Sequence, residues 1–151
     1  MRKAVFPGSF DPITKGHESI VNRASDLFDV IYVAVGINQS KNYLFDLEKR
    51  LELTKQTFAS NTKVEVLTYS KLTVKLCEEL GANYILRGLR NTSDFNYEYS
   101  IAMANREQNE KIETIFLATE PKLSGISSSI VRDVYKHGGN IKPFVPDGLE
   151  F

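Results

Sequence analysis

The sequence contains few of the features that mark secreted or membrane-bound proteins. Its 151 residues include one cysteine, Cys77, which cannot form a disulfide within the chain, so nothing indicates secretion. No window approaches the ~20 apolar residues that a membrane-spanning helix needs. The N-terminus, MRKAVFPG, does not resemble a signal peptide. We therefore expect a cytoplasmic protein that has no membrane partner.

An excess of charge of one sign is also absent. Lysine and arginine together number 19, aspartate and glutamate also number 19, and the formal net charge is zero. A nucleic-acid-binding protein usually carries a basic excess or a basic stripe, and neither is visible here. We expect no nucleic-acid partner, and any anionic ligand must be bound by a local cluster of groups.

Common sequence motifs of nucleotide and metal sites are missing as well. Neither G-x-G-x-x-G nor G-x-x-x-x-G-K-[ST] occurs, which excludes the usual dinucleotide fingerprint and the P-loop. No Cys/His cluster has the spacing of a metal site, and no Ser/His/Asp triad is evident. A site in this protein must therefore be assembled from several separate loops.

What the sequence does contain is a regular alternation of apolar runs and helical periodicity. Strands are predicted at residues 3–6, 30–36, 63–68, 83–86 and 113–118, and helices at 17–28, about 46–60, 73–80, 94–108 and from about 127 to 138. This pattern favours an α/β fold: a Rossmann-like, open, parallel five-stranded sheet with helices on both faces, in a single domain of residues 1–151. Ligands of such sheets bind beyond the carboxyl ends of the strands.

The same periodicity predicts which side chains are buried. Residues expected to face the core are Ile20, Val21, Ala24, Leu27, Phe28, Leu47, Leu51, Phe58 and Cys77. Tyr97 and Tyr99 could stack on a base, but aromatic residues on a helix more often belong to the core, which is the expectation here. Asp11 and Glu98 are lone acids, for which a structural role is expected.

Four loops after predicted strands carry groups suited to phosphate. The first, PGSFDPITKGH, ends on His17 in the first turn of a helix, where the helix dipole favours a neutral imidazole that can still donate one N–H. Lys41 follows the second strand, Arg87 and Arg90 follow the fourth, and serines 127–129 follow the fifth. One serine suffices to cap a helix, so the other two hydroxyls are expected to serve a ligand. A rigid turn, a solvated lysine and a charged strand exit are the plainer alternatives.

These segments resemble a known family. PGSFDPITKGH with its T-x-G-H motif, ILRGLRNTSDFNYE and ISSSIVRD are similar to the bacterial phosphopantetheine adenylyltransferases of the nucleotidyltransferase superfamily, and the resemblance covers essentially the whole chain. It implies that the adenylyl group of ATP is transferred to 4′-phosphopantetheine by direct in-line attack, without a covalent enzyme intermediate, giving dephospho-coenzyme A and pyrophosphate. It also implies Mg²⁺ held mainly by ATP phosphates and water, a homohexamer, and coenzyme A as a feedback ligand.

The resemblance further implies the roles of individual residues. His17 is the catalytic residue, which stabilises the transition state. The positions implied for ATP are Ser9, Phe10, His17, Gly88, Leu89, Arg90, Glu98, Leu123, Ser124, Gly125, Ile126, Ser127, Ser128 and Ser129. The positions implied for phosphopantetheine are Ser9, Lys41, Thr73 and Arg87, and no protein metal ligand is implied. Gly125 stands where relatives often have a bulky residue, and many relatives continue into a further helix after PFVPDGLEF.

Three other functions stay open from the sequence. The chain could be another nucleotidyltransferase, such as a cytidylyltransferase or a nicotinamide-mononucleotide adenylyltransferase, against which RGLR followed by DFNYE argues. It could be a nucleotide sensor without turnover, against which His17 and the serine run argue. It could be a fragment of a tRNA synthetase, against which the zero net charge argues.

Overall fold

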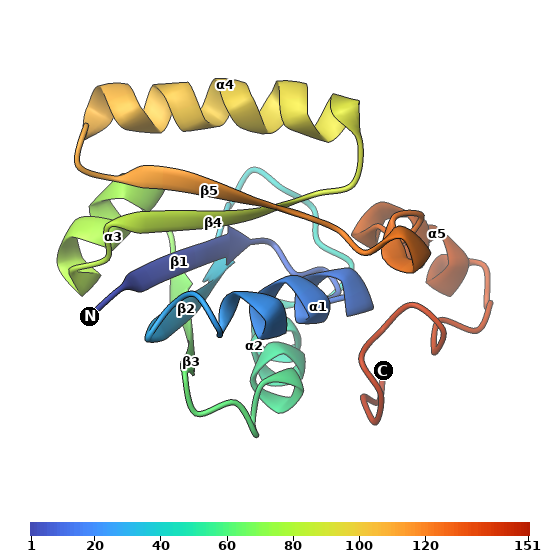
Figure 1. Ribbon diagram of the computed structural model, residues 1–151. Helices are drawn as coiled ribbons and strands as arrows, with labels where there is room; N and C mark the ends of the chain where they lie inside the picture. The colour runs from blue at the N-terminus through green and yellow to red at the C-terminus, as the bar shows by residue number, and fades with distance from the viewer.

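The computed structural model describes residues 1–151, which build one parallel five-stranded sheet (Figure 1). The strands are β1 (Lys3–Gly8), β2 (Val30–Gly36), β3 (Val64–Tyr69), β4 (Tyr84–Leu89) and β5 (Glu113–Ala118). The helices are α1 (Lys15–Ala24), α2 (Leu47–Thr57), α3 (Thr73–Leu80), α4 (Thr92–Gln108) and α5 (Ser128–Lys136), with a 3-10 turn, η1, at Pro121–Leu123. The α/β Rossmann-like class predicted from the sequence is confirmed.

The strand order is β3-β2-β1-β4-β5, so the direction of winding reverses between β1 and β4. At such a reversal the loops after the two neighbouring strands diverge and leave a crevice at the carboxyl edge of the sheet. PGSFDPITKGH runs from the end of β1 into the start of α1, and RGLR covers the end of β4 and the residue after it. The topology therefore brings the two most distinctive segments of the sequence to one edge.

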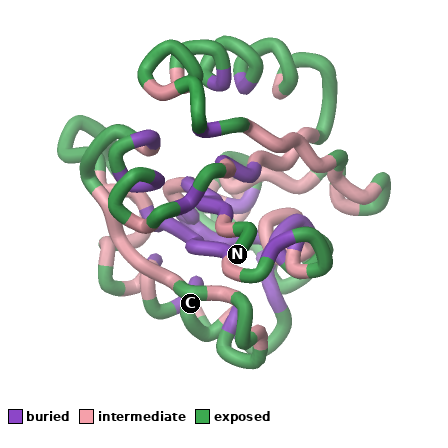
Figure 2. Tube along the Cα trace, turned by 60° about the vertical axis from the view of Figure 1, so that its left-hand side comes forward, coloured by how far each residue is buried: buried purple, intermediate pink, exposed green.

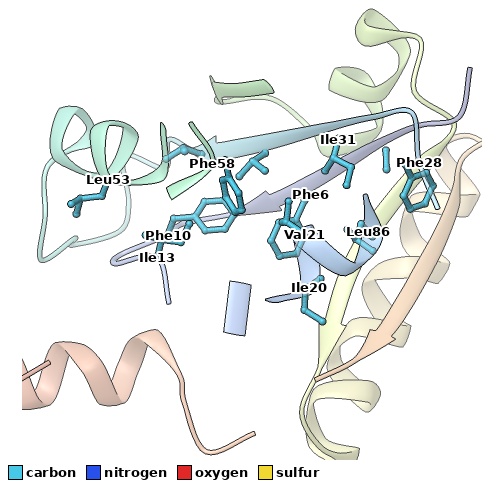
Figure 3. Packing of buried hydrophobic residues seen from close by; sticks show 14 of the residues in the cluster. Phe6, Phe10, Ile13, Ile20, Val21, Phe28, Ile31, Leu53, Phe58 and Leu86 are labelled. Carbon is cyan, nitrogen blue, oxygen red and sulfur yellow. The ribbon is translucent and has the colours of Figure 1, made fainter. Parts of the chain in front are cut away.

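Helices cover both faces of the sheet. Alternate residues of β1 point to opposite faces: Ala4 and Phe6 belong to a core shared with α1 and α2, and Val5 to a second core shared with α3. Figure 3 shows the first core, in which Phe6, Phe10 and Phe58 come together with residues of α1. Phe10 and Ile13 of the loop between β1 and α1 are buried in this core, so packing against the core fixes the position of the loop.

Helix α5 and the C-terminal segment lie beyond the carboxyl ends of the strands (Figure 1). They form a third small core of Val131, Ile141 and Val145. The segment after residue 139 has no helix or strand, as the sequence predicted. No helix of the protein is both long enough and apolar enough to cross a membrane.

Strand β4 is longer than predicted, and this changes the setting of the arginines. Arg87, Gly88 and Leu89 pair with residues 116–118 of β5, so they lie within the strand rather than after it. The predicted core positions are otherwise mostly confirmed: Ile20, Val21, Ala24, Phe28, Phe58 and Cys77 are buried, and Leu47 and Leu51 are partly buried against the first core.

Three predictions of burial are wrong. Helix α1 ends at Ala24 and a turn follows, so Leu27 points outward and is 44% exposed. Tyr97 and Tyr99 are 68% and 49% exposed, because α4 buries only Glu98 and Ala102. Figure 2 shows α4 as a largely exposed helix with two buried points. Neither tyrosine belongs to the core.

Candidate active site

Two cavities adjoin at the carboxyl edge of the sheet. The larger has a volume of about 830 Å³ and is lined by Lys41, Thr73 and residues of α4. The smaller has a volume of about 310 Å³ and is lined by His17, Arg90 and the starts of α1 and α5. Five residues line both cavities and form their shared wall: Pro7, Gly8, Ser9, Arg87 and Glu98.

The cavities separate the residues predicted for the site into two groups. Ser9, Lys41, Thr73 and Arg87, predicted for phosphopantetheine, line the larger cavity. Most of those predicted for ATP line the smaller one, namely Ser9, Phe10, His17, Gly88, Arg90, Glu98, Ile126, Ser127, Ser128 and Ser129. Four residues predicted for ATP line neither cavity: Leu89, Leu123, Ser124 and Gly125.

The loop after β1 is shaped by close packing around Phe10. A Cβ atom added at Gly8 would lie 2.9 Å from Cζ of Phe10, so only glycine allows this approach. Phe10 has a left-handed backbone (φ 47°), a conformation that costs energy for a bulky residue. Its buried ring lies edge-on to the ring of His17, with the centroids 5.0 Å apart. The core thus fixes the backbone of the loop and one side of the histidine.

Hydrogen bonds at the start of α1 determine where His17 carries its proton. Thr14 caps the helix, and its backbone N–H donates to Nδ1 of His17 over 3.0 Å. A backbone N–H can only donate, so Nδ1 must be the unprotonated nitrogen. The proton of the neutral ring is therefore on Nε2. The neutral imidazole has one N–H donor, and the side chain lines the smaller cavity.

The environment of His17 strongly favours its neutral form. Burial, followed by the nearby positive charges of Arg87 and Arg90, lowers the pKa of His17 from 6.5 to about 4. The sequence led us to expect a neutral ring because of the helix dipole. The structure favours the neutral ring too, but through burial and the two arginines.

Arg87 is engaged on the shared wall by a bidentate ion pair. Its Nε and one terminal nitrogen donate to the two carboxylate oxygens of Glu98 over 2.8 and 2.6 Å. Its other terminal nitrogen donates to the carbonyl oxygen of Pro7. Such a fork-to-fork pair fixes the plane of the guanidinium. Glu98 is buried, and the structural role expected for it is found in this pair.

Arg90 is held in a similar way in the smaller cavity. It donates to both carboxylate oxygens of Asp94 over 2.9 and 3.0 Å, and a further nitrogen lies 3.5 Å from the carbonyl oxygen of Ile126. Burial opposes ionisation of Asp94, but the hydrogen bonds and charge of Arg90 outweigh it and hold the pKa of Asp94 below its ordinary value. Asp94 therefore stays ionised and keeps Arg90 beside the loop that leads to α5.

The three serines at the start of α5 all have protein partners. Ser127 is the cap and accepts from the N–H of Ile130 over 3.2 Å. Ser128 donates to the carbonyl oxygen of Pro12 over 2.9 Å, and Ser129 accepts from Arg132 over 3.1 Å. Ser128 therefore connects α5 to the loop after β1, and Ser129 contacts a residue of α5 itself. Their oxygens keep further hydrogen-bonding capacity toward the cavity.

Asp11 connects the loop after β1 to both neighbouring segments. Its two carboxylate oxygens accept from the N–H groups of Leu44 and Phe45 over 2.8 and 2.9 Å. Its carbonyl oxygen accepts from Arg132 over 2.9 Å. The side chain is buried, and the structural role expected for Asp11 is confirmed.

The cation of the larger cavity stands on a loop. Lys41 lies between β2 and α2, and its side chain has no hydrogen-bond or ion-pair partner. Thr73, on the opposite side, is the first residue of α3, and the residue before it, Leu72, supplies no side-chain cap. The first N–H groups of α3 are thus not satisfied by a capping side chain.

Comparison with known proteins identifies the family of the chain. Residues 5–134 match the cytidylyltransferase-like family. The phosphopantetheine adenylyltransferase of Flavobacterium johnsoniae is 53% identical over 149 residues, which cover 99% of this chain and 97% of that protein. The chain belongs to the phosphopantetheine adenylyltransferase family. The family member of Bacteroides thetaiotaomicron is 44% identical over 150 residues, or 99% of each chain.

A solved structure supports the fold independently. A protein from Vibrio parahaemolyticus described as a nicotinate-nucleotide adenylyltransferase matches with a TM-score of 0.67, covering 96% of this chain and 94% of that chain. Its sequence identity is 21%, so this likeness shows the fold alone.

The acids of the two cavities do not form a site for a resident metal ion. They are Asp11, Asp94 and Glu98, and each carboxylate is already occupied by backbone N–H groups or by an arginine. No group of three or more His, Cys, Asp or Glu residues is placed to hold a metal. Mg²⁺ prefers carboxylate oxygens and water. The protein therefore does not offer the donor set of a dedicated Mg²⁺ site.

Two residues of the site were missed by the sequence analysis. Arg132 lies in the quoted segment ISSSIVRD, three residues after Ser129, so helical spacing places both on one face and could have revealed it. Arg50, on α2, contacts the carbonyl oxygen of Ser9. No local signal distinguishes it from an ordinary solvated arginine on a helix.

Proposed function

We propose that this chain transfers the adenylyl group of ATP to 4′-phosphopantetheine and releases dephospho-coenzyme A and pyrophosphate. One observation carries the proposal: two cavities meet at a common wall that contains Ser9 and Arg87, with His17 beside it. A reaction that joins two phosphorylated substrates needs two such adjoining spaces. The relatives of 44–53% identity, named phosphopantetheine adenylyltransferase, agree with this reaction.

We assign ATP to the smaller cavity and phosphopantetheine to the larger. The smaller contains Arg90 and the N-terminal turns of two helices, which suit a polyphosphate. The larger contains Lys41 and Arg87 for a single phosphate and has room for an extended arm along α4. Thr73 would contribute through its backbone. For Leu89, Leu123, Ser124 and Gly125 the assignment to ATP rests on the family resemblance only.

The chemistry needs positioning more than it needs a base. The attacking phosphate of phosphopantetheine is already ionised at neutral pH, so no group must remove a proton from it. What the protein must supply is alignment of the two phosphates and stabilisation of the oxygens whose charge changes in the transition state. His17, with a pKa of about 4, is a poor base at neutral pH but a good N–H donor through Nε2. We therefore assign it to the α-phosphate of ATP.

The remaining assignments follow from the resemblance and the chemistry. Mg²⁺ would enter with the phosphates of ATP, since Asp11, Asp94 and Glu98 are otherwise engaged. Residues 1–151 would act as one adenylyltransferase domain in a cytoplasmic homohexamer, with coenzyme A as a feedback ligand that shares the phosphopantetheine moiety of the substrate.

A pyrophosphate-release assay with ATP and 4′-phosphopantetheine tests the proposal. We expect turnover that depends on both substrates and falls about a hundredfold or more in His17→Ala. Replacing ATP by CTP, or phosphopantetheine by nicotinamide mononucleotide, should reduce the rate strongly. Faster release with either replacement would identify another nucleotidyltransferase, and binding without release would identify a nucleotide sensor.

A further inference from the structure

Arg50 is the largest fully buried side chain of the protein, with 1% of its surface exposed. It lies on α2, and one terminal nitrogen donates to the carbonyl oxygens of Ser9 over 2.7 Å and Gly36 over 3.0 Å. The Cζ atom of its guanidinium lies over the ring of Tyr43, 3.8 Å from the centroid. Its Nε is buried and has no hydrogen-bond partner.

This arginine has no carboxylate partner. Its charge is balanced only by two carbonyl dipoles and an aromatic face. Burying an ion without a counter-ion is costly, and replacing buried charges by apolar residues of similar volume is often neutral or stabilising. Stability alone therefore does not account for an arginine at this position, and a role in the site needs to be considered.

The three groups that Arg50 contacts belong to three parts of the site. Ser9 lies on the shared wall of the two cavities, and Gly36 is the last residue of β2, where the loop bearing Lys41 begins. Tyr43 lies on the same loop two residues after Lys41, and its hydroxyl accepts from the N–H of Asn38 over 3.1 Å. We call residues 37–46, between β2 and α2, the Lys41 loop. One guanidinium thus connects the start of this loop, at Gly36, and its later part, at Tyr43, to the shared wall.

We propose that Arg50 is a positioning residue that holds the Lys41 loop in register with Ser9, so that Lys41 faces the acceptor phosphate before the substrate binds. The identity of that substrate rests on the proposed function. This role needs both the stack on Tyr43 and the donation from one terminal nitrogen to two carbonyl oxygens. A lysine ammonium could donate to the two carbonyls, but it has no planar group to stack on the ring of Tyr43. Charge at this position is therefore not sufficient.

Steady-state kinetics of Arg50→Met and Arg50→Lys provide the first test. Lys55→Met is the matched control, because Lys55 is exposed on the same helix and the variant loses the same charge. We expect both Arg50 variants to raise KM for phosphopantetheine about tenfold, while KM for ATP and the Tm stay close to those of the control. An unchanged KM in Arg50→Met, or a normal KM in Arg50→Lys, would overturn the proposal.

Hydrogen–deuterium exchange of the substrate-free protein provides a test that does not depend on the reaction. We expect amides of residues 38–45 to exchange about tenfold faster in Arg50→Met than in Lys55→Met, with α5 unchanged. Equal exchange in the two variants would refute the positioning role even if the enzyme is active. If wild-type protein shows no turnover, the proposed function fails while this measurement still decides on Arg50. If neither Arg50 variant folds, Tyr43→Leu removes the stack and should give the same local increase.

Discussion

The two cavities differ in how their charged groups are held in place. In the smaller one, Arg90 is fixed by Asp94, and the start of α5 is tied to the loop after β1 through Ser128 and Arg132. In the larger one, the side chain of Lys41 has no partner and stands on a loop between β2 and α2. That loop is attached to the rest of the site by only a few groups, chiefly the carboxylate of Asp11 and the stack of Tyr43 on Arg50.

This difference suggests that the cavities contribute to catalysis in different ways. Groups held by short, mutually satisfied hydrogen bonds are pre-organised, and pre-organised donors lower the barrier of the chemical step. Arg50 can hold the backbone of the loop, but the side chain of Lys41 has no partner and loses its freedom when the ligand binds, and this cost reduces affinity. Substitutions in the smaller cavity should therefore change mainly the rate, and substitutions in the larger should change mainly the affinity.

The largest effect is expected for His17→Ala. If Nε2–H of His17 strengthens its contact in the transition state, kcat should fall about a hundredfold or more, with smaller changes in the two KM values. Steady-state kinetics with both substrates measure this split. His137→Ala is the control, because His137 lies at the end of α5 with 78% of its side chain exposed. A near-normal kcat in His17→Ala would contradict the proposal that the smaller cavity acts mainly on the rate.

The pKa of His17 should also be shifted strongly. We expect protonation of its ring near pH 4 in the folded protein, against 6.5 for an ordinary histidine. Because the unfolded chain takes up this proton at higher pH, the stabilisation from neutral His17 is complete above pH 6.5 and declines as pH falls toward 4. NMR of His137→Gln, which leaves one histidine, measures the midpoint. A midpoint near 6.5 would show that the ring of His17 is solvated and that the smaller cavity does not hold it in a buried position.

A smaller effect, confined to one substrate, is expected for Lys41→Ala. It should weaken phosphopantetheine binding about tenfold, the scale of one lost charge-assisted contact to phosphate, and leave ATP affinity within about twofold. Isothermal calorimetry with each ligand measures both values. Lys136→Ala removes an exposed lysine of α5 and serves as the control. Equal losses for both ligands would contradict the division of labour between the cavities.

The smallest effect is expected for Gly125→Ala. Nothing lies within 4 Å of a Cβ atom added at this position, and its backbone does not require glycine. We expect kcat/KM for ATP to stay within about twofold and the stability to change by less than about 0.5 kcal/mol, as for most surface substitutions. A marked change in KM for ATP would show that this loop contacts the nucleotide although it lines neither cavity.

The sequence predicted the sheet well because its strands are apolar or alternating segments, a local pattern that can be seen without knowing which strands lie beside them. The end of β4 shows the limit of this approach. Arg87 and Gly88 do not resemble strand residues, and they are extended because β5 runs alongside them. The exposure of Tyr97 and Tyr99 has a similar origin, since it depends on how little of α4 rests on the sheet. Properties set by a neighbouring element are not visible in a local pattern.

The same limit applies to the site. His17, Arg90 and the serine run could be found because each stands in a distinctive motif beside a predicted strand. Their mutual contacts could not be found, because Ser128 reaches Pro12 across 116 residues and Arg132 reaches Asp11 across 121 residues. Arg50 was missed for the opposite reason, since an arginine on an amphipathic helix is ordinarily solvated. Only the fold reveals that it is enclosed.

Ser9, Arg87 and Glu98, which lie on the shared wall, have a thermodynamic consequence for the binding of the two ligands. Because these residues face both cavities, a ligand that shifts the Arg87–Glu98 pair from one side changes the binding free energy on the other. Linkage requires that this change be equal in both directions. If ATP strengthens or weakens the binding of the acceptor, the acceptor must strengthen or weaken the binding of ATP by the same factor. The Arg87–Glu98 pair is the first place to look for the structural origin of such an effect.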